Sequence, residues 1–256
     1  MKSYQEMFSL KGERALITGA ATGLGRAIAE CFVNAGAEVI VVGLEDEAFG
    51  NRVCAEMGPG VHYLRFDISA TDKTDAFVQE AIAKFGAITI LVNNAGVHCK
   101  KPIEETTDAD FRKVMDVHIM GAFALTRAIV PYMKAQHKGS IIFQASMTSF
   151  IGQPYVIAYS CAKSGYLGLV RTLATEISPD GIRVNAIAPG WIDTPMLHQA
   201  IDGDEVRTHK ILGRTPLAKF GQAEDIGWAA VYLASQAAGF VNGVILPVDG
   251  GALIGF

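Results

Sequence analysis

The stretch Arg14-Ala15-Leu16-Ile17-Thr18-Gly19-Ala20-Ala21-Thr22-Gly23-Leu24-Gly25 decides the fold of this chain. Its first five residues form an apolar run that is typical of a buried strand, and residues 26–35 have the pattern of a helix. Glycines between a strand and a helix allow a tight turn and let a pyrophosphate approach the backbone N–H groups at the helix N-terminus. Three glycines can also simply form a turn, but their place near the start of an alternating chain favours a dinucleotide site.

The alternation of strand and helix continues to the end of the chain. We expect strands at 14–18, 38–42, 61–66, 88–92, 140–145, 182–187 and 244–248, and helices at 26–35, 46–57, 71–85, 108–136, about 159–177 and 223–235. This order implies a parallel sheet with right-handed crossovers and helices on both faces. Since no linker or composition break is present, we expect one domain over residues 1–256. The charged segment at about 193–214 has little apolar periodicity and is expected to be mobile.

Composition excludes several classes of function. Half of the 256 residues are hydrophobic and the formal net charge is −4, without a block of lysine or arginine, which argues against a nucleic-acid partner. Four cysteines (Cys31, Cys54, Cys99 and Cys161) lack metal-ligand spacing, so we expect no metal and a reducing compartment. No apolar leader begins the chain and no apolar run reaches about 18 residues. We therefore expect a cytoplasmic protein without a membrane partner.

A second stretch, Ala158-Tyr159-Ser160-Cys161-Ala162-Lys163, carries the candidate catalytic residues. On a helix, Tyr159 and Lys163 lie about one turn apart on the same face. An ammonium beside a phenol favours the phenolate, so we expect the pKa of Tyr159 to lie below its usual value of about 10. Such a tyrosine could exchange a proton with an alcohol near neutral pH. Ser146, after the strand at 140–145, could hold the substrate oxygen, although a tyrosine and a lysine four residues apart also occur by chance.

Taken jointly, five stretches resemble the short-chain dehydrogenase/reductase family over essentially the whole chain. They are Thr18 to Gly25, Asn93-Asn94-Ala95-Gly96, Ser146 with Tyr159 and Lys163, Pro189-Gly190 with Ile192 and Thr194, and Val248-Asp249-Gly250-Gly251. The resemblance implies an α/β single-domain Rossmann fold, a doubly wound seven-stranded parallel sheet, and a nicotinamide cofactor. It implies Tyr159 as general acid/base, Lys163 as the group that holds the ribose hydroxyls, and Ser146 as the group that polarises the substrate oxygen.

The resemblance also implies a cofactor-binding set. Its members are Gly19, Thr22, Gly23, Leu24, Gly25, Leu44, Glu45, Asp67, Ile68, Asn93, Ala95, Gly96, Tyr159, Lys163, Pro189, Gly190, Ile192 and Thr194. The acidic residue of the fingerprint would fall on Gly43, and Thr22 and Leu44 stand where an NADP enzyme would want a cation. Glu45 either starts the next helix or reaches the ribose hydroxyls, and in both cases its charge disfavours a 2′-phosphate. We therefore expect NAD(H) rather than NADP(H).

One position departs from the family's pattern. The stretch Val117-His118-Ile119-Met120-Gly121 has His118 where the family usually has an asparagine that shapes a helix bulge and holds a proton-relay water. A histidine can also donate and accept, and it titrates near neutrality. His118 is thus either a fourth catalytic candidate or a helix residue bonded to backbone.

The leading function is an NAD(P)-dependent alcohol dehydrogenase or carbonyl reductase. A catalytically silent dinucleotide-binding regulator is the rival, and the retained serine, tyrosine and lysine disfavour it. Stretches 8–12, 145–150 and 211–216 resemble gluconate and 2-deoxygluconate dehydrogenases, which predicts a sugar acid or polyol substrate; a 3-oxoacyl-thioester reductase stays open. Arg207, Lys210 and Arg214 could meet a carboxylate or simply be solvated. Small residues on the helices of His118 and Tyr159, where the family assembles, predict a homotetramer.

Overall fold

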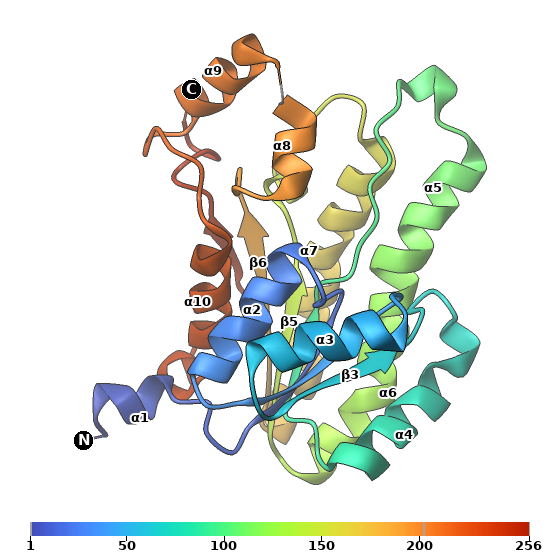
Figure 1. Ribbon diagram of the computed structural model, residues 1–256, viewed down its shortest axis with the longest axis vertical. Coiled ribbons are helices and arrows are strands. Elements are labelled where there is room, and N and C mark those ends of the chain that lie inside the picture. Colours follow the sequence, from blue (N-terminus) through green and yellow to red (C-terminus); the bar gives the residue numbers. More distant parts are fainter. Residues whose placement is uncertain (1, 202, 256) are drawn as a thin grey trace.

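The computed structural model describes residues 2–201 and 203–255. In this part of the chain seven strands form one sheet in the order β3-β2-β1-β4-β5-β6-β7, and every neighbouring pair is parallel (Figure 1). Their bounds are β1 (Arg14–Thr18), β2 (Glu38–Gly43), β3 (Val61–Arg65), β4 (Ile90–Asn93), β5 (Gly139–Gln144), β6 (Ile182–Pro189) and β7 (Ile245–Val248). The predicted doubly wound α/β fold with a seven-stranded parallel sheet is confirmed.

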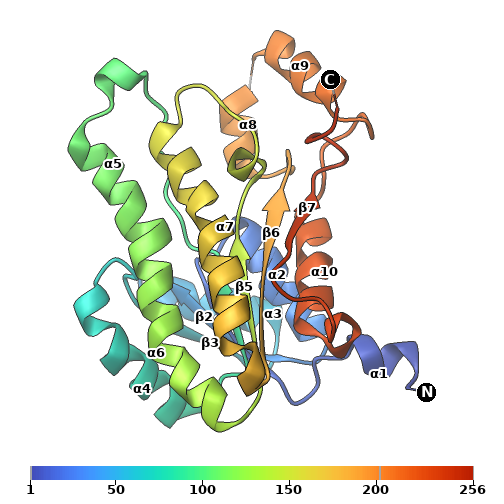
Figure 2. The same cartoon turned by 180° about the vertical axis from the view of Figure 1, so that it is seen from behind.

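Helices cover both faces of the sheet. One face carries α2 (Gly23–Asn34), α3 (Glu47–Met57) and α10 (Ala223–Ala234), and the other carries α4 (Thr74–Phe85), α6 (Ala122–Ala135) and α7 (Ile157–Ile177) (Figures 1 and 2). Ile17 packs into the first layer and its neighbour Leu16 into the second, because successive side chains of a strand point to opposite faces. This is why the strands are continuous apolar runs.

The long helical region expected at 108–136 is a single run of three pieces. It consists of α5 (Asp108–Met115), a π-helical turn (Asp116–Gly121) and α6. By length and composition this run could cross a membrane, but half of its most apolar window is buried inside the protein. Leu125 and Ile129 pack on the sheet, as the side chains of a core helix do.

The charged segment at about 193–214, for which the sequence showed little apolar periodicity, contains two helices, α8 (Pro195–Ile201) and α9 (Glu205–Arg214). They lie beyond the carboxyl ends of the strands (Figure 1). Leu197, Ile201 and Ile211 form a small buried cluster there, and Asp204 caps α9. Periodicity missed these helices because the side chains described as buried are few, Leu197 and Ile201 on α8 and Ile211 on α9.

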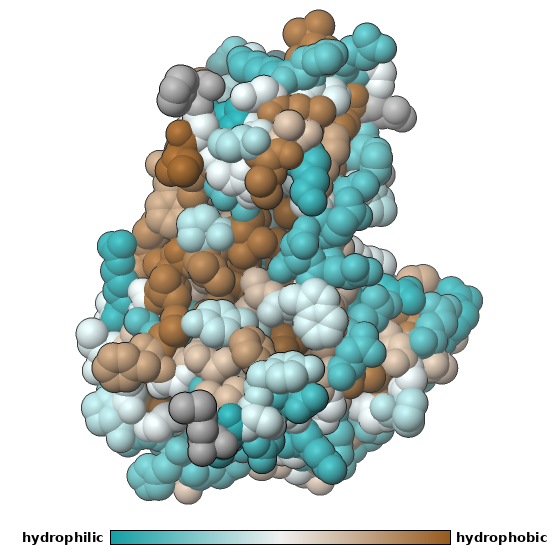
Figure 3. All heavy atoms as spheres, turned by 90° about the vertical axis from the view of Figure 1, so that its left-hand side faces the viewer, coloured by the Kyte–Doolittle hydropathy of each residue, from teal (hydrophilic) through white to brown (hydrophobic). Residues whose placement is uncertain are grey.

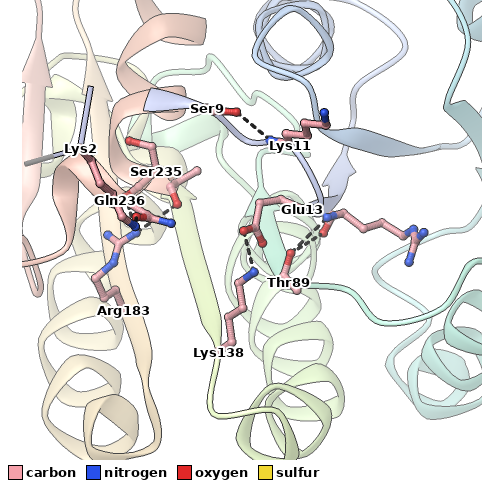
Figure 4. A network of polar contacts seen from close by, with 11 residues as sticks. Lys2, Ser9, Lys11, Glu13, Thr89, Lys138, Arg183, Ser235 and Gln236 are labelled. Carbon is pink, nitrogen blue, oxygen red and sulfur yellow. Dashed lines mark hydrogen bonds and ion pairs between the residues drawn. The ribbon is translucent and has the colours of Figure 1, made fainter. Parts of the chain in front are cut away.

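Polar contacts join the elements at the amino ends of the strands, on the side of the sheet away from α8 and α9 (Figure 4). Lys138 pairs with Glu13 at 2.6 Å, Thr89 accepts a hydrogen bond from the first residue of β1, and Arg183 donates to the Ser235 carbonyl. Helix α1 (Tyr4–Phe8) packs close by, against the residues that follow α10. These contacts close the amino ends of the strands, so the carboxyl ends are where a ligand can bind.

Candidate active site

The turn between β1 and α2 forms a cradle that requires glycine. Gly19 and Gly23 have φ angles of 64° and 56°, which glycine adopts without strain. A Cβ on Gly25 would lie 2.2 Å from the carbonyl oxygen of Gly19. The cap residue Thr22 makes no side-chain hydrogen bond, which leaves the N–H groups of the first turn of α2 for a ligand, and Leu24 packs into the core behind them.

Asn94 holds this cradle, and the sequence-based set of cofactor residues omitted it. Its side-chain amide donates to the carbonyl oxygens of Thr18 (2.9 Å) and Gly19 (3.1 Å), and the Thr18 hydroxyl accepts from the N–H groups of Asn94 and Ala95. The side chain of Asn93 instead donates to the Thr126 hydroxyl on α6. The second asparagine of Asn93-Asn94-Ala95-Gly96 was the available signal.

The end of β2 places an acidic side chain at the expected ribose position. A Cβ on Gly43 would lie 2.2 Å from the Glu45 carboxylate, so this carboxylate folds back over the glycine. The Tyr63 hydroxyl donates to the Glu45 carbonyl (2.8 Å). Leu44 is exposed, and its carbonyl accepts from Arg65 (3.1 Å), a cation that the sequence-based argument did not consider.

The residues that follow β3 have mainly structural contacts. Asp67 accepts hydrogen bonds from the N–H (2.9 Å) and hydroxyl (2.7 Å) of Ser69 and so closes the turn. Ile68 is buried, and its carbonyl faces Gly121 of the π-helical turn, where a Cβ would come within 2.6 Å. The absence of a side chain at Gly121 lets these two segments meet.

The carboxyl end of β6 leads into the opposite wall of the site. Pro189 ends β6, and Gly190 packs so tightly that a Cβ would lie 2.6 Å from the α-carbon of Asp249. The Asp249 carboxylate accepts from two backbone N–H groups of the C-terminal segment. Ile192 is buried, and the Thr194 hydroxyl accepts from the backbone at the start of α8. The Asp249-Gly250-Gly251 signature therefore supports the Pro189-Gly190 turn.

The three predicted catalytic side chains meet at the carboxyl end of β5. Ser146 follows β5 and accepts a hydrogen bond from the N–H of Thr148. Tyr159 and Lys163 lie one turn apart on α7, with the Lys163 Nζ 5.4 Å from the centre of the phenol ring. The same Nζ donates to the carbonyl of Gln144, and Ser146 lies near enough to the phenol to lower its pKa.

Burial dominates the pKa values of this group. It raises the pKa of Tyr159 above its usual value, and the hydrogen bond to Ser146 opposes this with a smaller effect. Burial also lowers the pKa of Lys163 from 10.5 to about 7. The structure therefore differs from the expectation that the lysine would lower the pKa of Tyr159, because both groups have left water and burial disfavours the charged form of each.

His118 lies in the π-helical turn, which is a helix bulge. Its ring meets Tyr159 edge-on at 5.5 Å between centroids, and its carbonyl accepts from the Tyr166 hydroxyl at 2.7 Å. Burial, and next the charge of Lys163, lower its pKa to about 3, so the ring is neutral at pH 7. The expectation that His118 titrates near neutrality is therefore wrong.

The His118 ring also supports the segment that leaves β4. Its Nε2 lies 2.8 Å from the Val97 carbonyl oxygen and accepts from the Val97 N–H at 3.1 Å, and a Cβ on Gly96 would lie 2.2 Å from the ring. Its Nδ1 is buried without a hydrogen-bond partner among residues 2–201 and 203–255. A relay role for His118 stays a prediction.

Other features surround the group formed by Ser146, Tyr159 and Lys163. Arg214, one of the expected carboxylate-binding cations, donates to the carbonyl of Ala252 and so anchors the C-terminal segment. A hollow of about 440 Å³ lies between α8 and α9, and none of the catalytic side chains lines it. The glycine cradle, the free N–H groups of α2 and the Pro189-Gly190 turn fit an elongated dinucleotide that ends beside Tyr159.

Comparison with known proteins agrees with this geometry. The family model described as enoyl-(acyl carrier protein) reductase matches residues 19–252, and the chain belongs to the short-chain dehydrogenase/reductase family of oxidoreductases that act on CH–OH groups with NAD(P).

Three relatives illustrate its neighbourhood within the family. The 2-dehydro-3-deoxy-D-gluconate 5-dehydrogenase of Pseudoalteromonas atlantica is 42% identical over 96% of this chain and 98% of the relative. A 3-oxoacyl-(acyl-carrier-protein) reductase of Thermotoga maritima is 35% identical over 96% of this chain and 99% of the relative. The solved gluconate 5-dehydrogenase of Burkholderia cenocepacia, in complex with NADP and tartrate, is 32% identical with a TM-score of 0.92 over 98% of each chain. Solved relatives from Beutenbergia cavernae and Agrobacterium tumefaciens also hold NADP.

Proposed function

We propose that this enzyme interconverts a secondary alcohol and a ketone in a sugar acid or polyol. The observation that carries the proposal is the meeting of Ser146, Tyr159 and Lys163 at the carboxyl end of β5, beside the glycine cradle. When bound, the nicotinamide supplies the acceptor or donor of the hydride. Ser146 holds the substrate oxygen, and Tyr159 takes the hydroxyl proton during oxidation and returns it during reduction. Lys163 binds the ribose hydroxyls and supplies positive charge beside the phenol.

Relatives support the substrate class. Those most similar in sequence include dehydrogenases of deoxygluconate derivatives, and the Burkholderia cenocepacia enzyme holds tartrate, a hydroxy acid. A 3-oxoacyl-thioester reductase is the second candidate, because a relative of that activity covers the same length. A silent dinucleotide-binding regulator is disfavoured by the complete catalytic group.

A substrate panel tests this function. Gluconate, deoxygluconate derivatives, polyols and 3-oxoacyl thioesters are followed through NAD(P)H absorbance, and we expect turnover of sugar acids or polyols. Tyr159→Phe should lower kcat by about 10²- to 10⁴-fold, the usual contribution of a general acid/base, and leave cofactor binding nearly unchanged. Tyr4→Phe, on exposed α1, is the matched control. Activity confined to acyl thioesters would reject the substrate class, and a Tyr159→Phe enzyme with wild-type kcat would reject the mechanism.

We further propose a preference for NAD(H). The Glu45 carboxylate over Gly43 supports it, because it stands where the ribose 2′-OH is expected and repels a phosphate there. Arg65 and the NADP held by several relatives are the arguments for the other cofactor.

Assembly as a homotetramer is also proposed. Met120 and Phe123 are exposed and apolar beside α7, and Trp228 and Phe240 are exposed on the other side of the molecule, around α10. Figure 3 faces the side of α10 and has apolar residues gathered in a band there. Two separate apolar surfaces suit the two interface types of a tetramer with twofold axes.

The four free cysteines support a cytoplasmic location.

A further inference from the structure

His98 lies in the segment that follows β4, and contacts of the backbone before and after it hold this segment in place. On one side, the backbone of Val97 is held by the His118 ring, whose Nε2 accepts from the Val97 N–H. On the other, the N–H of Lys101 donates to the Tyr155 carbonyl at 2.8 Å. The backbone around His98 is thereby tied to the π-helical turn and to the residues just before α7.

The His98 ring lies against the catalytic tyrosine. Its centroid is 4.8 Å from that of Tyr159, with 34° between the ring planes, and the residue is exposed on its other side. Neither ring nitrogen of His98 hydrogen-bonds to another residue in the described ranges 2–201 and 203–255. An imidazole in contact with the acid/base and open to solvent is available to a substrate.

The charge state of His98 suits a hydroxyl group. Burial of part of the ring, and then the charges of Lys100 and Lys163, lower its pKa below 6.5. Both effects favour the neutral ring, in which one nitrogen donates a hydrogen bond and the other accepts one. A hydroxyl can do the same, whereas a carboxylate prefers a cation.

We propose that His98 binds the oxygen on the carbon next to the reacting carbon, so that the enzyme selects vicinal diols and α-hydroxyketones over isolated alcohols and ketones. The proposal rests on the proposed function in taking Tyr159 as the group that meets the reacting oxygen. Since the two rings are in contact, the imidazole reaches the neighbour of that carbon. In a 3-oxoacyl thioester the carbons next to the ketone carry no oxygen, so the same contact disfavours that class.

A matched pair of ketones tests the proposal. Reduction of 3-hydroxybutan-2-one and of butan-2-one is compared in the wild type, His98→Phe and His98→Gln. Phenylalanine keeps a flat ring against Tyr159 and removes both nitrogens, whereas glutamine keeps hydrogen-bonding groups. We expect His98→Phe to lower kcat/KM for the hydroxyketone by about 3- to 10-fold more than for butan-2-one, the effect of one neutral hydrogen bond, and His98→Gln to restore part of the loss. If turnover of either ketone is too slow, competitive inhibition of sugar-acid turnover by each ketone compares how tightly each variant binds the two ketones.

A distant histidine is the control. His62 is exposed and stacks on Phe85 at 4.7 Å, so His62→Phe makes the same change away from the site and should change neither ketone. Equal losses on both ketones in His98→Phe would overturn the proposal and leave His98 as mere support for Tyr159. If sugar acids are substrates in that case, the proposed function still stands. A wild type that reduces only acyl thioesters would overturn both.

Discussion

At the scale of single residues, burial controls the chemistry of this site more than spacing does. Four residues along a helix bring Tyr159 and Lys163 together, but the pKa of the tyrosine is raised and that of the lysine falls to about 7. Lys163 also bears on stability: the unfolded lysine, with a pKa near 10.4, binds a proton that the folded lysine lacks. Its contribution to the free energy of unfolding is therefore present above about pH 10 and is lost as the pH falls toward 7.

Cofactor choice is also a residue-scale property. We expect the wild type to have the higher kcat/KM with NAD(H), and Glu45→Ala to weaken NAD binding by about 10- to 100-fold, because a hydrogen bond to a charged group is lost. Glu47→Ala, in the same acidic run but in the first turn of α3, is the control and should change little. Binding of both cofactors is measured by fluorescence titration.

A second variant separates the opposing charges. Arg65→Ala should leave NAD binding near the wild-type value and lower residual NADP binding, since a phosphate is what the guanidinium would recognise. A wild type that clearly prefers NADP(H) would contradict the role given to Glu45.

At the scale of elements, the β1–α2 turn depends on one close approach. Gly25→Ala should abolish detectable cofactor binding and lower the Tm, because its Cβ would lie 2.2 Å from the Gly19 carbonyl and 2.5 Å from the Asn94 amide. Gly213→Ala is the matched control, since Gly213 also lies inside a helix but has open space around it. This control should keep binding and gain up to about 1 kcal/mol in stability. Calorimetry and titration with NADH measure both; normal binding by Gly25→Ala would show that the cradle is not the cofactor site.

At the scale of the whole molecule, the two exposed apolar surfaces are the proposed interfaces of the homotetramer. We expect light scattering at micromolar concentration to report four times the chain mass of 27.3 kDa. Replacing Trp228 and Phe240 together by glutamate should leave a dimer, because the surface with Met120 and Phe123 is intact. Val206→Glu, on an exposed position of α9, should keep the tetramer. A monomeric wild type would contradict the proposed assembly.

The amino-acid sequence by itself predicted the features that depend on residues close together along the chain. The apolar runs, the glycines at 19, 23 and 25, and the four-residue step from Tyr159 to Lys163 predicted the seven strands, the cradle and the catalytic pair. Each of these patterns is local, so the period of a strand or helix and the backbone freedom of glycine are enough to interpret it.

Folding had to supply what depends on distant contacts and on loss of water. The Asn94 amide meets a turn 75 residues away, the Glu45 carboxylate folds back over Gly43, and the His98 ring meets Tyr159 across the site. Burial, which no single residue reveals, raises the pKa of Tyr159 and lowers those of Lys163 and His118. Loss of water and contacts between distant residues arise only when all the helices and strands pack together, so a local sequence pattern does not predict them.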